Sequence, residues 1–354
     1  MSEPEIICEA RGAVGLVTLN RPQALNALTS GMVDALAAAL RDWARDPAIG
    51  CVVVRGAGGR AFSAGGDIRA LYEAGRAGRI DEAAAFWLEE YLLNIAIKRF
   101  AKPYLALVGG IVMGGGVGVS FHGSHRVAGE RFLFAMPEVG IGFFPDVGAT
   151  WFLPRLPGET GTYLALTGSR IGPDDARALG LATHLAPTAS FEAIVERLAA
   201  GEAPDDVLAS LARPPGPSPL LAERTLIDRC FAAPSVAEIL ARLDREAEAG
   251  SAFARDAAAT IRTKSPTSLV VALAQMRAGR DLDFEAAMAL EFRIVNRIAA
   301  GHDFYEGVRA TIIDKDGAPA WRPASLAELD PDEVVRAHVA PLGARELPVG
   351  PEAR

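Results

Sequence analysis

Hydrophobic positions in the first part of the chain follow two different periods. Residues 14–19 and 51–54 are short runs rich in β-branched side chains, which is typical of buried strands. Between them, apolar residues recur every three or four positions from 32 to 43, which predicts a helix with one apolar face. Thr29 or Ser30 offers a hydroxyl that can accept an unpaired N–H at its start. The chain is therefore predicted to open with a strand, a helix and a strand.

The alternation continues through the next eighty residues. Strands are predicted at 104–108 and 125–128, and helical segments at about 80–100 and 113–122. This order favours an α/β core over a β-sandwich.

After about residue 190 the pattern changes, and Ala, Leu, Arg and Glu dominate in segments such as 235–249 and 284–300. We therefore predict an α/β core at residues 1–190, a mainly helical region at 191–340 and a flexible tail at 341–354. The proline-rich stretch 213–219 is expected to form an extended loop inside the helical region.

Composition and charge exclude several partners. The chain has 354 residues, with 36 basic against 44 acidic residues and a net charge of −8, which argues against a nucleic acid or an anionic membrane. Cys8, Cys51 and Cys230 are far apart, so neither a disulfide framework nor a zinc site is expected. The apolar stretch 105–121 is too short and too glycine-rich for a membrane span. Residues 1–5 are acidic and resemble no targeting signal, from which we expect a cytoplasmic location.

Common catalytic signatures are missing from the sequence. No two of the five histidines have the spacing of a metal site, and no Gly-x-Ser-x-Gly turn occurs. The glycine cluster at 113–118 fits neither the dinucleotide-binding nor the phosphate-loop pattern. The sequence therefore predicts neither a metal nor a cofactor.

Two segments of small residues stand between a predicted strand and a predicted helix, at 62–67 and 109–118. Such turns leave backbone N–H groups unpaired at the start of the helix, and glycine lets a ligand oxygen approach them. Two turns that face one another would form an oxyanion hole. The alternative is that the glycines serve only tight turns and close packing.

Two carboxylates, Glu138 and Asp146, are isolated in the strongly apolar stretch 134–148. Loss of water disfavours the charged form of a carboxylate and raises its pKa toward the range of general acid–base chemistry. The alternative is that Glu138 caps a turn after Pro137 and that Asp146 caps a helix beginning near Val147.

The motifs at 20–28 and 64–68 resemble the crotonase (enoyl-CoA hydratase/isomerase) superfamily. Further segments narrow the resemblance to the 3-hydroxyisobutyryl-CoA hydrolase family. These segments are 110–118, 134–148, 163–168, 265–269 and 301–310. The resemblance implies an α/β fold, a crotonase-like spiral of ββα units with a helical C-terminal region. It covers about residues 5–335 and is weakest between about 186 and 260.

The resemblance also implies functional residues. It makes Glu138 and Asp146 the catalytic acids, Ala64 and Gly115 the oxyanion-hole residues, and Glu90 the ligand of the substrate hydroxyl. The implied substrate-binding set is Glu90, Gly115, Glu138 and Asp146. The implied CoA-binding set is Asn26, Ala27, Gly66, Asp67 and Ile68.

The implied reaction depends on one departure from the hydratase pattern. Hydratases of the superfamily carry a first glutamate shortly after the oxyanion glycine and a second at the position of Glu138, but here the first position is Gly118. The resemblance thus implies hydrolysis of 3-hydroxyisobutyryl-CoA in valine breakdown, with CoA as part of the substrate and no separate cofactor. Glu138 would attack the thioester or act as general base, and Asp146 would position water or protonate the thiolate. Self-association into a homo-oligomer is also implied.

Three other functions stay open at this point. A dienoyl-CoA isomerase uses a similar Glu and Asp pair, an enoyl-CoA hydratase shares the fold, and a non-catalytic member would only bind acyl-CoA. Glu90 and the segments 265–269 and 301–310 favour the hydrolase over the isomerase, because isomerases generally lack those segments.

Overall fold

The computed structural model describes residues 3–349. The chain forms two compact units that interleave along the sequence. The first unit comprises Met1–Asp67, Glu89–Phe134 and Ile171–Leu221, and the second comprises Ile68–Leu88, Ala135–Arg170 and Ala222–Arg354. The predicted domain limits at residues 190 and 340 stay predictions.

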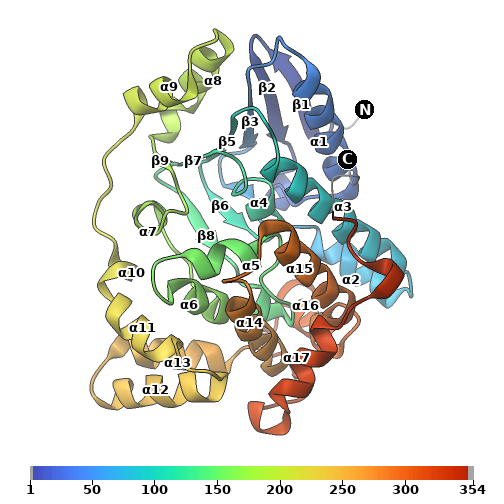
Figure 1. The fold of residues 1–354 in the computed structure, drawn as a ribbon, viewed down its shortest axis with the longest axis vertical. Helices are drawn as coiled ribbons and strands as arrows, with labels where there is room; N and C mark the ends of the chain where they lie inside the picture. The colour runs from blue at the N-terminus through green and yellow to red at the C-terminus, as the bar shows by residue number, and fades with distance from the viewer. Residues whose placement is uncertain (1–2, 350–354) are drawn as a thin grey trace. The chain divides into compact units, whose positions relative to one another are not determined.

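A six-stranded sheet organises the first unit, in the order β1-β2-β3-β5-β7-β9. Strand β1 is antiparallel to β2, and the other neighbours are parallel (Figure 1). The strands predicted at 14–19, 51–54, 104–108 and 125–128 are confirmed. The strand bounds are β1 Ile6–Arg11, β2 Val14–Leu19, β3 Cys51–Gly56, β5 Tyr104–Val108, β7 His125–Ala128 and β9 His184–Leu185.

Helices cover this sheet by burying their apolar faces. Helix α1 (Ser30–Arg45) begins where predicted, and the Thr29 side chain accepts a hydrogen bond from the Met32 N–H at 3.3 Å. Helices α8 (Phe191–Ala199) and α9 (Pro204–Leu211) share one hydrophobic core with the strands. The shared core includes Val14, Val53, Leu105, Ile194, Val195 and Leu208.

A second sheet has the order β4-β6-β8 and was not predicted, because its strands are only three residues long. Its strands are β4 Ala61–Ser63, β6 Ile111–Met113 and β8 Leu133–Ala135. Strands β4 and β6 are parallel and each leads directly into one of the two glycine-rich turns. The pairing therefore places both turns at the same edge of this sheet.

The helix after the second glycine turn is shorter than predicted. Helix α4 comprises only Gly115–Gly118, whereas the pattern predicted helix over 113–122. Three of its four residues are glycine, which is the poorest helix former after proline. In contrast, α3 (Ile80–Lys98) agrees with the prediction for 80–100.

The second unit is mainly helical, as the sequence predicted for its later part. Helices α12 and α15 confirm the predictions for 235–249 and 284–300. Its helices are α2 Ile68–Arg76, α5 Ala149–Phe152, α6 Thr160–Thr167, α11 Arg224–Phe231, α12 Val236–Glu248, α13 Ala252–Arg262, α14 Pro266–Ala278, α15 Phe284–Ile298, α16 His302–Val308 and α17 Pro331–Val339. The fold class predicted from the sequence is confirmed.

The connections and the C-terminus complete the fold. Helices α7 (Pro173–Ala178) and α10 (Pro219–Ala222) flank a stretch that includes the proline-rich segment, in which residues 213–218 form no helix or strand, as predicted. Within the predicted flexible tail, Leu347 is buried and Glu346 forms an ion pair with Arg293 at 3.0 Å. Residues 350–354 of that tail lie outside the described residues.

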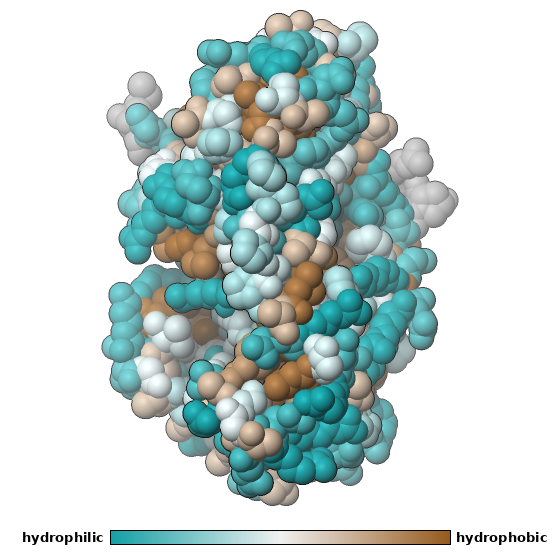
Figure 2. Space-filling view, turned by 90° about the vertical axis from the view of Figure 1, so that its left-hand side faces the viewer, coloured by the Kyte–Doolittle hydropathy of each residue, from teal (hydrophilic) through white to brown (hydrophobic). Residues whose placement is uncertain are grey.

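The described surface carries few large apolar side chains. Among residues 3–349, only Ile80 and Val349 are exposed large hydrophobic residues. Figure 2 shows one face on which hydrophilic residues predominate and hydrophobic residues form small separate groups. No helix in this part of the chain is both long and apolar enough to cross a membrane.

Asn26 fixes the start of the second sheet. It is fully buried with a positive φ of 56°, which asparagine tolerates better than most residues. Its Nδ2 donates to the carbonyl oxygens of Ala57 at 3.0 Å and Ala61 at 2.9 Å, and its Oδ1 accepts from the Arg21 N–H at 2.9 Å. One side chain thereby satisfies three backbone groups beside β4.

Asn26→Ala should lower the free energy of unfolding by about 2–4 kcal/mol, because buried carbonyl oxygens lose their donor and alanine resists the positive φ. Thermal and urea unfolding would measure the change. Asn296→Ala is the matched control, since the amide of Asn296 donates only to a carbonyl oxygen of its own helix, and it should cost less than about 1 kcal/mol. Equal losses in the two variants would contradict this role for Asn26.

Candidate active site

In the first unit, two glycine turns and one helix converge on a single point. A Cβ atom placed on Gly115 would overlap Oε1 of Glu90 on α3 and would lie 3.2 Å from the backbone nitrogen of Gly66. Gly115 begins α4, and Gly66 follows β4. Little space is therefore left for a side chain at Gly115, and three of the residues implied by the resemblance lie together.

The backbone N–H groups of these turns differ in what they already bind. The Ala64 N–H donates to the Leu25 carbonyl oxygen at 3.0 Å. Within the described residues, the N–H groups of Gly66 and Gly115 donate to no protein acceptor. The hydrogen bond of the Ala64 N–H speaks against Ala64 as an oxyanion donor, whereas the N–H groups of Gly66 and Gly115 are unused; the oxyanion hole itself stays a prediction.

Arg21 and nearby backbone groups hold several of the residues predicted to bind CoA. The Arg21 side chain donates to the Ala27 carbonyl oxygen at 2.7 Å and to Asp67 Oδ2 at 3.0 Å. The Asn26 side chain is fully engaged with backbone groups, so only its main chain is left for a ligand. Ile68 begins α2 in the second unit. CoA binding at these residues stays a prediction.

In the second unit, Glu138 and Asp146 are both buried, with exposed fractions of 6% and 4%. Glu138 opens the short 3₁₀ helix η2 (Glu138–Ile141), and within residues 3–349 its Oε2 atom has no hydrogen-bond partner. Burial raises the pKa of Glu138 well above 4.5, and the negative charges of Asp146 and Glu291 raise it further. Glu138 therefore has the environment of a proton-transferring group.

The capping interpretation of these two carboxylates stays open. The N-cap residue of η2 is Pro137, and that of α5 is Gly148. Asp146 receives the Ala149 N–H through its backbone oxygen at 3.0 Å.

The C-terminal blocks that carried the resemblance hold the Glu138 segment in place. The Ser265 N–H donates to the Val139 carbonyl oxygen at 3.3 Å, and the Ser265 hydroxyl donates to buried Asp303 at 2.6 Å. Gly142 has a φ of 68°, and a Cβ there would overlap the Asp303 backbone. A Cβ on Gly307 would likewise overlap the backbone of Ile141. These residues therefore position η2 from two distant parts of the chain.

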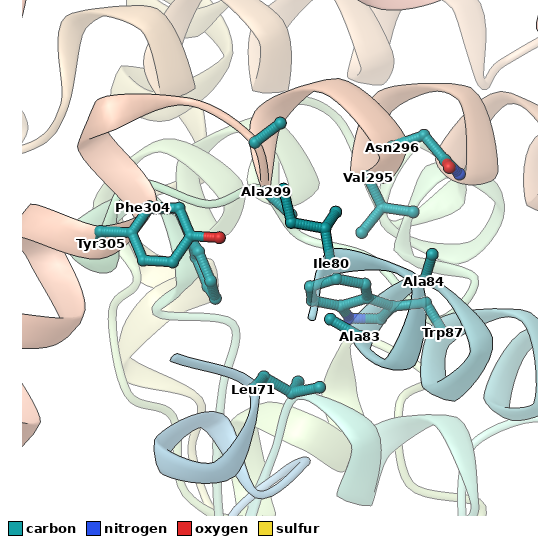
Figure 3. Close-up of a pocket in the computed structure, with 11 residues that line it drawn as sticks. Leu71, Ile80, Ala83, Ala84, Trp87, Val295, Asn296, Ala299, Phe304 and Tyr305 are labelled. Atoms are coloured by element: carbon teal, nitrogen blue, oxygen red, sulfur yellow. The ribbon is translucent and has the colours of Figure 1, made fainter. Parts of the chain in front are cut away.

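An aromatic cluster and a small cavity lie in the same unit. Phe143 packs on Trp87 with ring centroids 5.7 Å apart and on Phe304 at 5.5 Å. The side chains of Trp87 and Phe304 also line a cavity (Figure 3). Its other lining residues are Leu71, Ile80, Ala83, Ala84, Val295, Asn296, Ala299, Ala300 and Tyr305. No carboxylate lines this cavity, so it is distinct from the carboxylate cluster.

The sequence analysis missed a third buried carboxylate, Glu291 on α15. Its Oε2 accepts the Gly148 N–H and its Oε1 accepts the Thr150 N–H, both at 2.8 Å. Burial and the charge of Asp146 raise its pKa to about 8. A signal was available, because Glu291 occupies an apolar-face position in the predicted helix 284–300.

No group of three or more His, Cys, Asp or Glu side chains in the described part of the chain is arranged to hold a metal ion.

Comparisons with known proteins agree with the motifs. A family model described as Enoyl-CoA hydratase/isomerase matches residues 14–338. The 3-hydroxyisobutyryl-CoA hydrolase, mitochondrial, of Rattus norvegicus is 43% identical over 97% of this chain and 90% of its own length. The protein of the same name from Danio rerio is 45% identical over 91% and 86%, respectively, and that from Homo sapiens 41% over 97% and 90%.

Two solved structures also cover nearly the whole chain. One is titled a carnitinyl-CoA dehydratase from Mycobacterium thermoresistibile, with a TM-score of 0.90, 40% identity, and coverage of 97% of this chain and 98% of that chain. The other is titled an enoyl-CoA hydratase from Rhodobacter sphaeroides, with a TM-score of 0.89, 40% identity, and coverage of 97% and 99%.

The comparisons overturn the predicted cytoplasmic location. The hydrolases named above are mitochondrial proteins, which contradicts the expectation of a cytoplasmic location. The prediction depended on the acidic composition of residues 1–5, and that composition does not distinguish between the two compartments.

Relative to the wild type, the Glu138→Gln variant should become more stable as the pH rises. A raised pKa means that the folded protein holds the proton of Glu138 more tightly than the unfolded chain does, so stability falls as the pH rises above about 4.5. Glutamine keeps the shape without ionising. The stability of the variant relative to the wild type should therefore increase between about pH 5 and about pH 8.

Urea unfolding at several pH values would measure this difference. Glu89→Gln, at an exposed position on α3, is the control and should show no such trend. A Glu138→Gln difference that stays constant with pH would contradict the raised pKa.

Proposed function

The chain belongs to the enoyl-CoA hydratase/isomerase family, and from that premise we propose that it hydrolyses a short hydroxyacyl-CoA, with 3-hydroxyisobutyryl-CoA as the main substrate. The observation that carries this proposal is the burial of Glu138 with Asp146 as its charged neighbour and with a raised pKa. The names of the relatives from rat, zebrafish and human support the same reaction.

In this reaction a thioester and one water become a carboxylic acid and free CoA. As general base, Glu138 takes a proton from water while the water oxygen forms a bond to the carbonyl carbon. The carbon–sulfur bond then breaks and the thiolate leaves with a proton. Asp146 orients the water or supplies that proton. A raised pKa suits Glu138 to this work, because a stronger base removes a proton from water more readily.

A covalent route uses the same residues. Glu138 then attacks the carbonyl carbon directly, CoA leaves as the thiol, and water hydrolyses the resulting mixed anhydride. Both routes need Glu138 ionised at the moment of attack. Labelling with ¹⁸O water in a single turnover distinguishes them, since only the covalent route leaves ¹⁸O in Glu138 or gives an unlabelled acid.

The N–H groups of Gly66 and Gly115 suit an oxyanion hole. Both are unused by protein acceptors in the described chain, and they lie close together. In the family that the motifs resemble, such N–H groups bind the oxygen of the thioester, and loss of one donor typically costs about 3–4 kcal/mol of transition-state stabilisation. Glu90 lies against Gly115 and is proposed to bind the acyl hydroxyl.

One observation favours a hydratase function. Of the two solved structures compared above, one is titled as a dehydratase and the other as a hydratase. Hydration by the family pattern needs a second glutamate after the oxyanion glycine. The corresponding residue is Gly118, which is buried in α4 and has no side chain to move a proton. The carboxylates of this chain therefore favour hydrolysis over hydration.

The wider role depends on the substrate. Release of 3-hydroxyisobutyrate would place the reaction in valine breakdown. The acyl-CoA and water are sufficient for it, so no separate cofactor is proposed. Assembly into a homo-oligomer stays a prediction from the family resemblance.

The wild type should release free thiol from 3-hydroxyisobutyryl-CoA and 3-hydroxypropionyl-CoA, and crotonyl-CoA should yield none. Glu138→Gln should lower kcat by about 10²–10⁴-fold, the usual range for a lost general base. A colorimetric thiol assay measures the release, and absorbance of the enoyl group follows hydration of crotonyl-CoA. Rapid loss of that absorbance without any thiol release would overturn the hydrolase in favour of the hydratase.

Glu90→Gln should weaken recognition of the acyl hydroxyl. A hydrogen bond to a charged group is worth about 1.5–3 kcal/mol, so kcat/KM for 3-hydroxyisobutyryl-CoA should fall by roughly 10–100-fold. Isobutyryl-CoA, which lacks the hydroxyl, should be affected much less. Glu89→Gln is the control on the neighbouring exposed position. Equal losses with both substrates would show that Glu90 does not bind the hydroxyl.

A further inference from the structure

Glu291 is a carboxylate at the start of a helix that belongs to another part of the chain. It lies on α15 with an exposed fraction of 0%, and its two oxygens accept the N–H groups of Gly148 and Thr150. These groups belong to the first turn of α5, whose N-cap residue is a glycine with no side chain to accept them. Glu291 thus caps α5 from 141 residues away in the sequence.

The turn that Glu291 caps is strained and carries Asp146. Val147 follows Asp146 directly, is fully buried and has a φ of 52°. A β-branched residue in this left-handed region costs on the order of 1–3 kcal/mol and persists only where its surroundings hold it. Gly148 continues the turn with a φ of 91°. The direction of the Asp146 side chain therefore depends on contacts that fix this backbone.

A second side chain holds the same turn from the other end. Nε2 of Gln275 on α14 donates to the Pro145 carbonyl oxygen and, at 2.7 Å, to Oγ1 of Thr150. The residue before Asp146 is therefore held by α14, and the residues after it are held by α15.

A carboxylate suits this capping, because each of its two oxygens accepts one of the two N–H groups. Within the described residues, Glu291 forms no ion pair, and the charge that acts on it is that of Asp146. Burial of a carboxylate without a cation is costly. The cations on neighbouring elements have other partners or positions: Arg155 binds carbonyl oxygens, Arg277 pairs with Glu159, Arg297 binds carbonyl oxygens and Lys264 lies against Gly140.

We propose that Glu291 is a positioning residue for hydrolysis: it fixes the Pro145–Gly148 turn through two backbone N–H groups and so sets the place of the Asp146 carboxylate relative to Glu138. This role rests on the proposed function. Under this proposal the charge of Glu291 also contributes to the reaction, because a negative group in the same buried cluster makes Glu138 a stronger base.

Glu291→Gln tests the role with little change in volume. The glutamine oxygen can still accept one N–H, but its NH₂ group would face the other N–H donor. We expect kcat to fall by about 10–100-fold, as for a reacting group displaced by about 1 Å, with KM within about twofold of the wild type. The rising limb of the pH profile of kcat/KM should also move to lower pH, because a negative charge that raises the pKa of Glu138 is gone.

Glu159→Gln is the matched control. Glu159 is also a buried carboxylate of the second unit, but it binds Thr162 and Arg277 and not the Asp146 turn. It should lose stability while its kcat and pH profile stay those of the wild type. A shift of the pH profile in Glu159→Gln as large as in Glu291→Gln would overturn the proposed role.

Further outcomes separate this inference from the proposed function. An active wild type with an unchanged, folded Glu291→Gln variant would overturn the role of Glu291 alone. A wild type that releases no thiol would overturn the hydrolase and this role with it. Should Glu291→Gln fail to fold, Gln275→Met removes the other support of the turn. It should then lower kcat with KM retained, and wild-type kcat in that variant would equally overturn the role.

Discussion

The burial of Glu138 and Glu291 without an ion pair is the constraint on which the second unit depends. Glu138, Asp146 and Glu291 are each at most 6% exposed, and neither Glu138 nor Glu291 has an ion pair in the described chain. A buried carboxyl group is tolerated where backbone N–H groups donate hydrogen bonds to it or where it is protonated. Glu291 combines both, since two N–H groups donate to it and burial raises its pKa to about 8. Glu138 follows the second, since its raised pKa favours the protonated form.

The helical C-terminal region is explained by this constraint better than by packing alone. Helix α14 supplies Ser265 at its N-cap and Gln275 near its end, and α15 supplies Glu291. The backbone N–H of Ser265 and the side chains of Gln275 and Glu291 all bind backbone groups within residues 137–150. Rigid support of a backbone segment costs conformational entropy. It is functionally useful where a reacting group must be held in place. Helices α14 and α15 therefore fix the conformation of residues 137–150, in which buried carboxylates are energetically unfavourable.

The sequence was informative where a residue's own neighbours determine its structure. The strands at 14–19 and 104–108 and the helix from Ser30 are predicted by apolar periodicity and a cap, and all three are confirmed. The three-residue strands β4 and β6 escaped prediction because they contain too few residues to show a period. Ala64 was selected from a motif, yet its N–H bonds Leu25, a contact that only tertiary structure creates. Glu291 was readable as a charge on an apolar helical face, although its two partners, Gly148 and Thr150, were not.

The two units carry different kinds of chemical group. The glycine turns of the first unit offer unused N–H groups, which in the proposed function stabilise negative charge on an acyl thioester. The reaction that follows in that proposal depends on the acids. In this chain α4 is built of Gly115, Gly116, Val117 and Gly118, so it adds no acid beside the turns. In the second unit, the backbone that carries Glu138 and Asp146 is held by α14 and α15. The position of these two acids therefore depends on that support as well as on the acids themselves.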